Sequence, residues 1–165
     1  MDYTVDLIER IPETIRPKGD SPAEQILKFK HHREANGILK YYIEKCDYLS
    51  AYTVAFSLLE DRVRATAIVK KRDLLNSTDF EKYASMKLGH VADFIYQKSP
   101  KHKIFLQNLK SAFFNRNKLI HEAMWRVNAI CLRDIEIVIE LRDIVASDLR
   151  ALKRQITYNN KNLTA

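Results

Sequence analysis

The sequence predicts an all-α protein, a helical bundle of about five helices with a long C-terminal helix. The chain of 165 residues has only 3 glycines and 4 prolines, too few for the many tight turns of a sandwich, a barrel or a wound α/β sheet. Apolar residues make up 46% of the chain, enough for one sizeable core without disulfides or a structural metal. Several long stretches also space their apolar residues by three or four, as helices do. We therefore expect residues 1–165 to form a single helical domain.

The first two helices follow from a capping signal and from apolar spacing. Ser21-Pro22-Ala23-Glu24 has the pattern of a capping box with proline at the first helical position, and it predicts a helix that ends near Gly37. The stretch from Ile38 to Leu88 contains neither glycine nor proline. Within it, one predicted helix face recurs every three or four residues: Tyr48, Tyr52, Ala55, Leu59, Val63, Thr66 and Val69.

The middle helices are predicted from turn residues and a shorter apolar stripe. Asn76–Asp79 provides a turn and an N-cap for a helix from about Phe80 to Lys98. Ser99-Pro100 then restarts the chain and opens a further helix. The apolar stripe of that helix consists of Phe105, Leu109 and Ala112.

The last helix has the most regular pattern in the chain. Apolar residues step by three or four from Ile120 to Ile156, which predicts a helix of roughly 35–40 residues, about 55 Å long. Residues 158–165, with three asparagines, are expected to form a frayed tail. A helix of this length either packs along shorter helices or offers its apolar stripe to a second copy of the chain. The sequence leaves both arrangements open.

Charge and cysteine usage limit the classes of function. The 28 Lys and Arg residues against 21 Asp and Glu give a net charge of +7, which permits contact with a polyanion. Cys46 and Cys131 have no partners at metal-ligand spacing, so we expect no zinc site, disulfide framework or cofactor. The N-terminus is acidic and interrupted, unlike a signal peptide, and no apolar run is long enough to span a membrane. We expect a cytoplasmic protein.

One long segment lacks acidic residues: none occurs from Phe94 to His121. Such a run in a chain with 21 acids is uncommon and favours contact with phosphates. The alternative is an ordinary solvated helix face. The lysines expected to contact phosphates are Lys101, Lys103, Lys110 and Lys118.

The same segment contains the pattern Arg116-Asn117-x-x-x-His121. An asparagine directly after the arginine, at this fixed spacing from a histidine, is expected by chance only about 0.02 times in such a composition. Residues five apart on an unbroken helix are separated by about 140°, so the two side chains converge only if the helix breaks. Asn115 and Asn117 offer a helix stop and an N-cap. We therefore expect a break there, with His121 in the first turn of the final helix, near backbone N–H groups that favour a phosphate.

These side chains suit the cleavage of RNA without a metal. An arginine guanidinium is a planar fork of donors that matches phosphate oxygens. A histidine has an ordinary pKa near 6.5, which suits proton transfer at neutral pH. RNA supplies its own nucleophile, the 2′-hydroxyl, and a twofold dimer would supply two histidines, one as base and one as acid. The alternative is that His121 is a buried, hydrogen-bonded core histidine.

The segment resembles the signature of HEPN domains (higher eukaryotes and prokaryotes nucleotide-binding), which are helical bundles of this size with an Arg-x4–6-His motif. The specific match is confined to Arg116–His121. The resemblance implies a metal-independent endoribonuclease, the toxin of a toxin–antitoxin or antiviral abortive-infection system, with a composite site across a homodimer. Its implied partners are RNA, a second copy of the chain and an antitoxin or inhibitor protein.

The resemblance also implies roles for individual residues. Arg116 and His121 would be catalytic, and Asn117 would support them. Glu60 is a candidate for the acidic residue that the family often has in an earlier helix, although an i,i+4 pair with Arg64 explains it equally well. Ala123 stands where one subgroup has a tyrosine that receives AMP. Two other functions stay open: a non-catalytic HEPN-like dimerisation or nucleotide-binding module, and an unrelated helical nucleic-acid-binding regulator.

Overall fold

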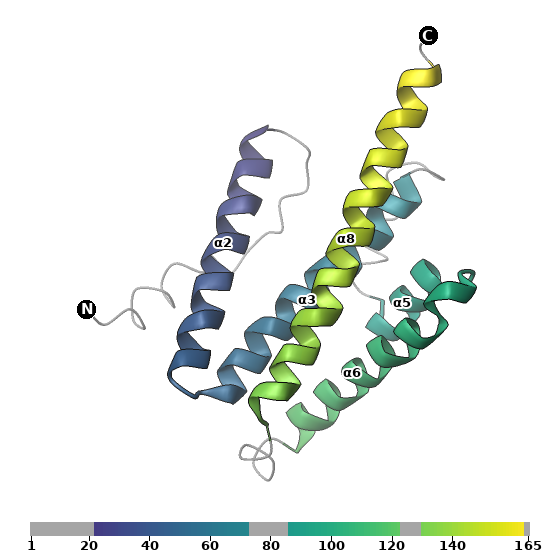
Figure 1. Ribbon diagram of the computed structural model, residues 1–165. Helices are drawn as coiled ribbons and strands as arrows, with labels where there is room; N and C mark the ends of the chain where they lie inside the picture. Colours follow the sequence, from purple (N-terminus) through teal and green to yellow (C-terminus); the bar gives the residue numbers. More distant parts are fainter. Residues whose placement is uncertain (1–21, 73–85, 123–129, 164–165) are drawn as a thin grey trace. The chain divides into compact units, whose positions relative to one another are not determined.

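The computed structural model describes residues 22–72, 86–122 and 130–163, and these residues contain helices but no strand, which confirms the all-α prediction. The chain divides into two units, residues 1–36 and 37–165, and the candidate site lies in the second. No helix in the described ranges is long and apolar enough to cross a membrane. The helices are α2 (Pro22–Glu44), α3 (Tyr48–Arg72), α5 (Leu88–Tyr96), the 3-10 helix η2 (Pro100–His102), α6 (Lys103–His121) and α8 (Leu132–Leu163) (Figure 1).

The core of the second unit is centred on α3 and α8, the most extensively packed pair of helices in the described chain. The predicted face of α3 is buried at its centre, and α8 buries its own stripe at the predicted spacing. α5 packs against α3 and against α6 (Figure 1). Each large apolar side chain buried in this way stabilises the fold by roughly 1.5–3 kcal/mol. The buried positions of the two helices include Tyr52, Ala55, Leu59, Val63, Ile135, Val138, Leu141, Val145 and Leu149.

The helix expected to end near Gly37 continues to Glu44, so that prediction is wrong. A glycine inside a helix costs only about 1 kcal/mol relative to alanine, and a Schellman stop uses a residue in the left-handed region. That residue is Cys46, whose φ is +56°. Its N–H donates to the Ile43 carbonyl at 3.0 Å and closes the last turn of α2.

The residue after Cys46 ends one helix and begins the next. The N–H of Asp47 donates to the Tyr42 carbonyl at 2.9 Å, which completes the hydrogen-bond pattern of a Schellman motif. Its side-chain Oδ1 accepts the N–H of Ser50 at 3.1 Å and caps the N-terminus of α3. The end of α2 and the start of α3 are therefore set without glycine or proline.

The helix predicted from Phe80 to Lys98 is shorter, because α5 spans only Leu88–Tyr96. Residues 86 and 87 are not helical. The carbonyl of Met86 instead accepts a hydrogen bond from Nη1 of Arg64 at 3.1 Å, which ties the entry of α5 to α3. The predicted N-cap at Asn76–Asp79 lies outside the described residues.

The C-terminal end of α5 is held by side chains from its neighbours. Lys70 Nζ donates to the carbonyls of Phe94 at 3.3 Å and Ile95 at 2.5 Å. The hydroxyl of Tyr96 donates to Asp148 Oδ2 of α8 at 3.0 Å. Burial, and then the negative charge of Asp148, raise the pKa of Tyr96 far above its ordinary value, so the phenol stays protonated in the fold.

The final helix begins later than predicted. α6 ends at His121, residues 130 and 131 are not helical, and α8 begins at Leu132. The start is fixed by Asp134, whose Oδ2 accepts the N–H of Cys131 at 2.9 Å. α8 has 32 residues and continues to Leu163, so a frayed tail is wrong for residues 158–163.

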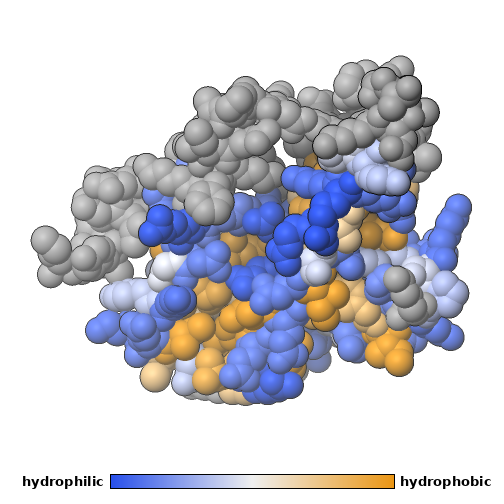
Figure 2. All heavy atoms as spheres, turned by 45° about the horizontal axis from the view of Figure 1, so that its top comes forward, coloured by the Kyte–Doolittle hydropathy of each residue, from blue (hydrophilic) through white to orange (hydrophobic). Residues whose placement is uncertain are grey.

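Large apolar side chains are also exposed outside the core. On α8, Ile137 and Ile144 are 40% and 44% exposed, although the opposite face of the helix is buried against α3. On α6, Ile104 and Phe114 are 73% and 67% exposed. Figure 2 shows one face of the molecule, where apolar patches alternate with hydrophilic side chains.

Candidate functional site

The helix that carries the motif is basic throughout. α6 contains four Lys or Arg residues and no Asp or Glu. Its solvent-facing stripe follows a spacing of three or four residues and is exposed at every position: Lys103, Gln107, Lys110, Phe114, Asn117 and His121. A polyanion that approaches α6 therefore meets cations and amides around one exposed aromatic ring.

The predicted helix break at the motif is wrong, because α6 runs unbroken from Lys103 to His121. Asn115 and Asn117 lie inside the helix with exposed side chains. An exposed asparagine lowers helix stability by only a fraction of a kcal/mol, and the burial of Ala112 and Phe113 on the opposite face outweighs it. As a result, Arg116 and His121 are about 140° apart around the helix axis and do not converge within one chain.

Arg116 is held against the core by two contacts. Its guanidinium carbon lies 5.4 Å from the ring centroid of Phe56 on α3, a residue that is only 2% exposed. Its Nη1 donates to Oδ1 of Asn117 at 3.2 Å. A cation over a buried ring contributes roughly 0.5–2 kcal/mol and restricts the orientation of the guanidinium. The structure therefore brings together Arg116 and the asparagine that was expected to support it.

His121 is the last residue of α6, not part of the first turn of the final helix. Its side chain is exposed, so the alternative of a buried core histidine is wrong. Unpaired carbonyls, not N–H groups, lie at this end of a helix, and the helix dipole is negative there. The expected phosphate site on backbone N–H groups beside His121 is therefore wrong, and a phosphate must be held by side chains.

The four lysines expected to bind RNA differ in their surroundings. Lys103 is exposed. Lys110 forms an ion pair with Asp93 of α5 at 2.7 Å, which offsets part of its charge. Lys118 is half-buried and lines a pocket. Lys101 lies in η2, and its side chain is outside the described part.

Glu60, the acidic candidate, is bound to Arg64. The Arg64 Nη2 and Nε atoms lie 2.8 and 2.9 Å from Glu60 Oε1, and the Arg64 side chain is 11% exposed. Since Arg64 also holds the Met86 carbonyl, this i,i+4 pair serves to position the entry of α5. Ala123 lies outside the described residues.

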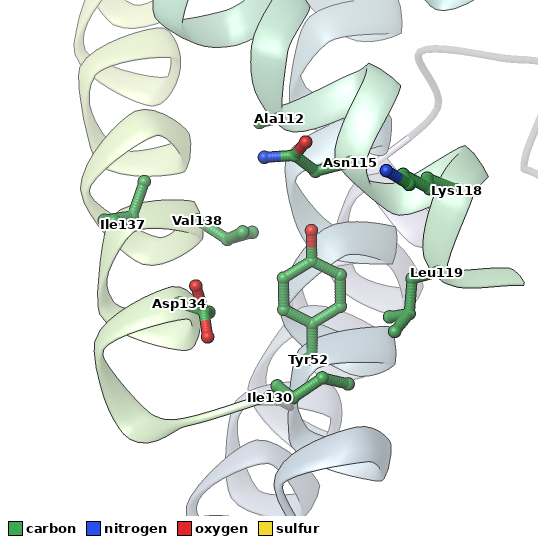
Figure 3. Close-up of a pocket in the computed structure, with 9 residues that line it drawn as sticks. All are labelled: Tyr52, Ala112, Asn115, Lys118, Leu119, Ile130, Asp134, Ile137 and Val138. Atoms are coloured by element: carbon green, nitrogen blue, oxygen red, sulfur yellow. The ribbon is translucent and has the colours of Figure 1, made fainter. Parts of the chain in front are cut away.

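A pocket of about 250 Å³ lies next to the motif, between α3, α6 and the start of α8 (Figure 3). Sequence reasoning missed it, because Tyr52 was assigned to the core and Asp134 had no motif around it. The available signal was the pair of polar residues Asn115 and Lys118, of which the first directly precedes the motif and the second lies inside it. The lining residues are Tyr52, Ala112, Asn115, Lys118, Leu119, Ile130, Asp134, Ile137 and Val138.

Tyr52 lies at the centre of this pocket. Its ring stands between Asp134 and Leu119, and its hydroxyl points toward Asn115 (Figure 3). Burial raises the pKa of Tyr52, the charge of Asp134 raises it further, and the positive charge of Arg116 lowers it. The phenol is therefore neutral at physiological pH and available as a hydrogen-bond donor.

Within the described ranges, no three His, Cys, Asp or Glu side chains are close enough together to hold a metal ion. Both cysteines are exposed and free. Comparison of the chain with protein-family models, with curated proteins and with solved structures gives no match.

Proposed function

We propose that this protein is a metal-independent endoribonuclease of the HEPN type that acts as the toxin of a toxin–antitoxin or abortive-infection system. The observation that carries the proposal is the arrangement at the end of α6. Arg116 is oriented by Phe56 and Asn117, and His121 is exposed on the last turn of a helix without acidic residues. A fixed guanidinium and an accessible imidazole are the two groups that cleavage by the 2′-hydroxyl requires.

In the proposed reaction His121 exchanges protons with the 2′-hydroxyl and with the leaving 5′-oxygen. Arg116 stabilises the charge that develops on the phosphorane-like transition state. The products then carry 2′,3′-cyclic phosphate and 5′-hydroxyl ends. DNA binds but is not cut, since it lacks the 2′-hydroxyl.

The proposed site needs a second copy of the chain. Because Arg116 and His121 point about 140° apart on one helix, a single copy does not place both against the same phosphate. In a twofold dimer, His121 of one copy faces Arg116 of the other, and the cleft holds two of each. We expect light scattering to report a dimer; full activity in a monomer of 19.3 kDa would contradict the composite site.

The decisive experiment is cleavage of end-labelled RNA in EDTA. Loss of a general acid–base costs about 10²–10⁴ in rate, so His121→Ala should nearly abolish cleavage without changing the melting temperature. His90→Ala is the matched control, because His90 is also exposed and lies on α5, outside the motif. Cleavage that needs Mg²⁺ and leaves 5′-phosphate ends, or full activity of His121→Ala, contradicts the proposal.

The lysines of α6 are proposed to contact phosphates without reading bases. Lys103→Gln and Lys118→Gln should each weaken RNA binding, with the salt slope falling by about 1 for each lost contact. Lys153→Gln, on the exposed surface of α8, is the control. If RNA affinity does not change between about 50 and 200 mM salt, the lysines of α6 do not contact phosphates and form only a solvated helix face.

A second candidate function is favoured by the unbroken α6. If the two motif side chains never meet, the protein is a non-catalytic HEPN-like dimerisation or nucleotide-binding module. Expression in a bacterial host separates the two functions. The endoribonuclease arrests growth, and His121→Ala relieves the arrest; the non-catalytic module leaves growth unchanged in both cases.

A further inference from the structure

The pocket beside the motif has the features of a binding site for a single nucleobase. We propose that it binds a base with an exocyclic amino group, adenine, cytosine or guanine, and discriminates against uracil. This inference rests on the proposed function, because it assigns the specificity of the same site. The residues that carry it are Tyr52, Asn115, Lys118 and Asp134.

The size of the pocket favours one ring system. At about 250 Å³ it is smaller than the roughly 300–1,000 Å³ of pockets for drug-sized ligands. Its walls are mostly apolar and include Leu119, Ile137 and Val138, side chains that suit the flat faces of an aromatic heterocycle. A base fits these limits, whereas a complete nucleotide extends out of the pocket.

The charges in the pocket favour a neutral ligand with a phosphate at its edge. Lys118 on α6 and Asp134 on α8 lie on opposite walls (Figure 3). A bare phosphate inside the pocket would be repelled by the Asp134 carboxylate. A base inside the pocket, with its own phosphate on the side of Lys118, satisfies both charges. That phosphate then contacts Lys118, which is two residues from Arg116 on the helix that carries the motif.

Asp134 determines which base is accepted. Its Oδ2 is occupied by the N–H of Cys131 at 2.9 Å and by the thiol at 3.2 Å. Neither of these hydrogen bonds uses Oδ1, so in the proposal Oδ1 is the acceptor that Asp134 offers to the pocket, and adenine, cytosine and guanine each offer an amino group to it. Uracil offers only its N3–H, flanked by two carbonyl oxygens that a carboxylate repels.

Asn115 and Tyr52 complete the polar surface. The amide of Asn115 has both a donor and an acceptor, so it pairs with the edge of any of the three amino-bearing bases. The neutral hydroxyl of Tyr52 points toward Asn115 and donates to a ring nitrogen or a carbonyl (Figure 3). The selection against uracil therefore depends on Asp134 alone.

The test measures binding and does not depend on cleavage. The full chain is titrated with AMP, CMP, GMP and UMP by isothermal calorimetry, with nuclear magnetic resonance to locate the site. We expect UMP to bind on the order of tenfold more weakly than the other three, because it leaves a charged acceptor unpaired. Equal affinity for all four nucleotides, or binding of none, overturns the proposal.

Asp134→Asn makes the test specific. The asparagine oxygen still accepts the Cys131 N–H, so the cap of α8 is kept, while its NH₂ group now faces the pocket as a donor. A donor pairs with a carbonyl oxygen of uracil, whereas adenine has no carbonyl oxygen, so the preference between these two bases should invert and UMP should bind better than AMP. Equal weakening of all four nucleotides would mean that Asp134 has only a structural role. Asp143→Asn, an exposed residue of the same helix, is the control and should leave the preference unchanged.

Two further measurements separate this inference from the proposed function. Lys118→Gln should lower the affinity for AMP but not for adenosine, because only AMP has a phosphate. If the base preference appears and inverts as described while RNA is never cleaved, the pocket assignment stands and the endoribonuclease proposal fails. If RNA is cut with equal efficiency at all four bases and UMP binds like the others, the endoribonuclease proposal stands and the pocket assignment fails.

Discussion

The interface between α3 and α8 and the last turns of α6 lie close together, but different interactions hold their side chains in place. The interface is a row of fully buried side chains, with Leu59, Val63 and Ile135 at 0% exposure. The end of α6 has exposed or half-buried polar side chains, among which Arg116 is held by the Phe56 ring and by Asn117. The first region supplies stability, and the second is where chemistry is accessible to a ligand. Substitutions in the first region should therefore lower the free energy of unfolding, and substitutions in the second should lower activity.

The largest effect is expected for Leu59→Ala in the interface. Removal of a fully buried leucine side chain costs about 2–5 kcal/mol of the free energy of unfolding, because the cavity only partly collapses. Leu132→Ala, at a position that is 39% exposed, should cost under about 1 kcal/mol. Urea denaturation measures both. Similar losses in the two variants would show that the α3–α8 interface is not the main source of stability.

Arg116→Lys should have the opposite effect, because it should lower the cleavage rate and leave the stability nearly unchanged. The ammonium keeps the charge but loses the planar fork and the fixed orientation over Phe56, so cleavage should fall by about 10²–10³. The melting temperature should change little, because Arg116 is at the edge of the core. Single-turnover cleavage and thermal unfolding are measured on the same preparation. A stable fold with full activity would remove Arg116 from the proposed reaction.

The same contrast explains what the sequence could predict. Apolar spacing identified the buried faces of α3 and α8 correctly, since side chains such as Val63 and Val145 recur at the helical period and are fully buried. It could not locate the helix ends, because apolar spacing continues from Ile120 across the start of α8. That start depends on Asp134 and its hydrogen bond to Cys131, a contact of one side chain.

The candidate site was predicted only in part, for a related reason. His121 is exposed and Arg116 contacts Asn117, but Asn117 lies inside α6 and not at the expected helix stop or N-cap. The convergence of Arg116 and His121 was expected from a break that the packing of Phe113 prevents. The pocket depends on Tyr52 and Asp134, which are distant in sequence and meet only through the tertiary fold.

A smaller effect is expected for Tyr96→Phe, which removes the polar contact between α5 and α8. Loss of the donor to Asp148 should cost about 1–3 kcal/mol at pH 7. Above a pH of about 10 the unfolded state releases the Tyr96 proton while the fold retains it, so wild-type stability falls by up to about 1.4 kcal/mol per pH unit from this group. The Tyr96→Phe variant does not lose stability in this way, so the difference in the free energy of unfolding between the two proteins should shrink as the pH rises above 10. Tyr158→Phe, at an exposed position, should show neither effect.

The smallest effect is a gain in stability at Cys46, where α2 ends without a glycine. Its φ of +56° is strained for any residue with a Cβ atom, so Cys46→Gly should raise the free energy of unfolding by about 1 kcal/mol. Cys46→Ala removes the thiol but keeps the Cβ atom, and it should therefore match the wild type. The thiol is exposed, and its contact with the Tyr48 hydroxyl is at the surface, so its loss should add little to either variant. Urea denaturation of the three proteins decides the matter. A glycine variant no more stable than the alanine variant would mean that the backbone strain is not what limits this turn.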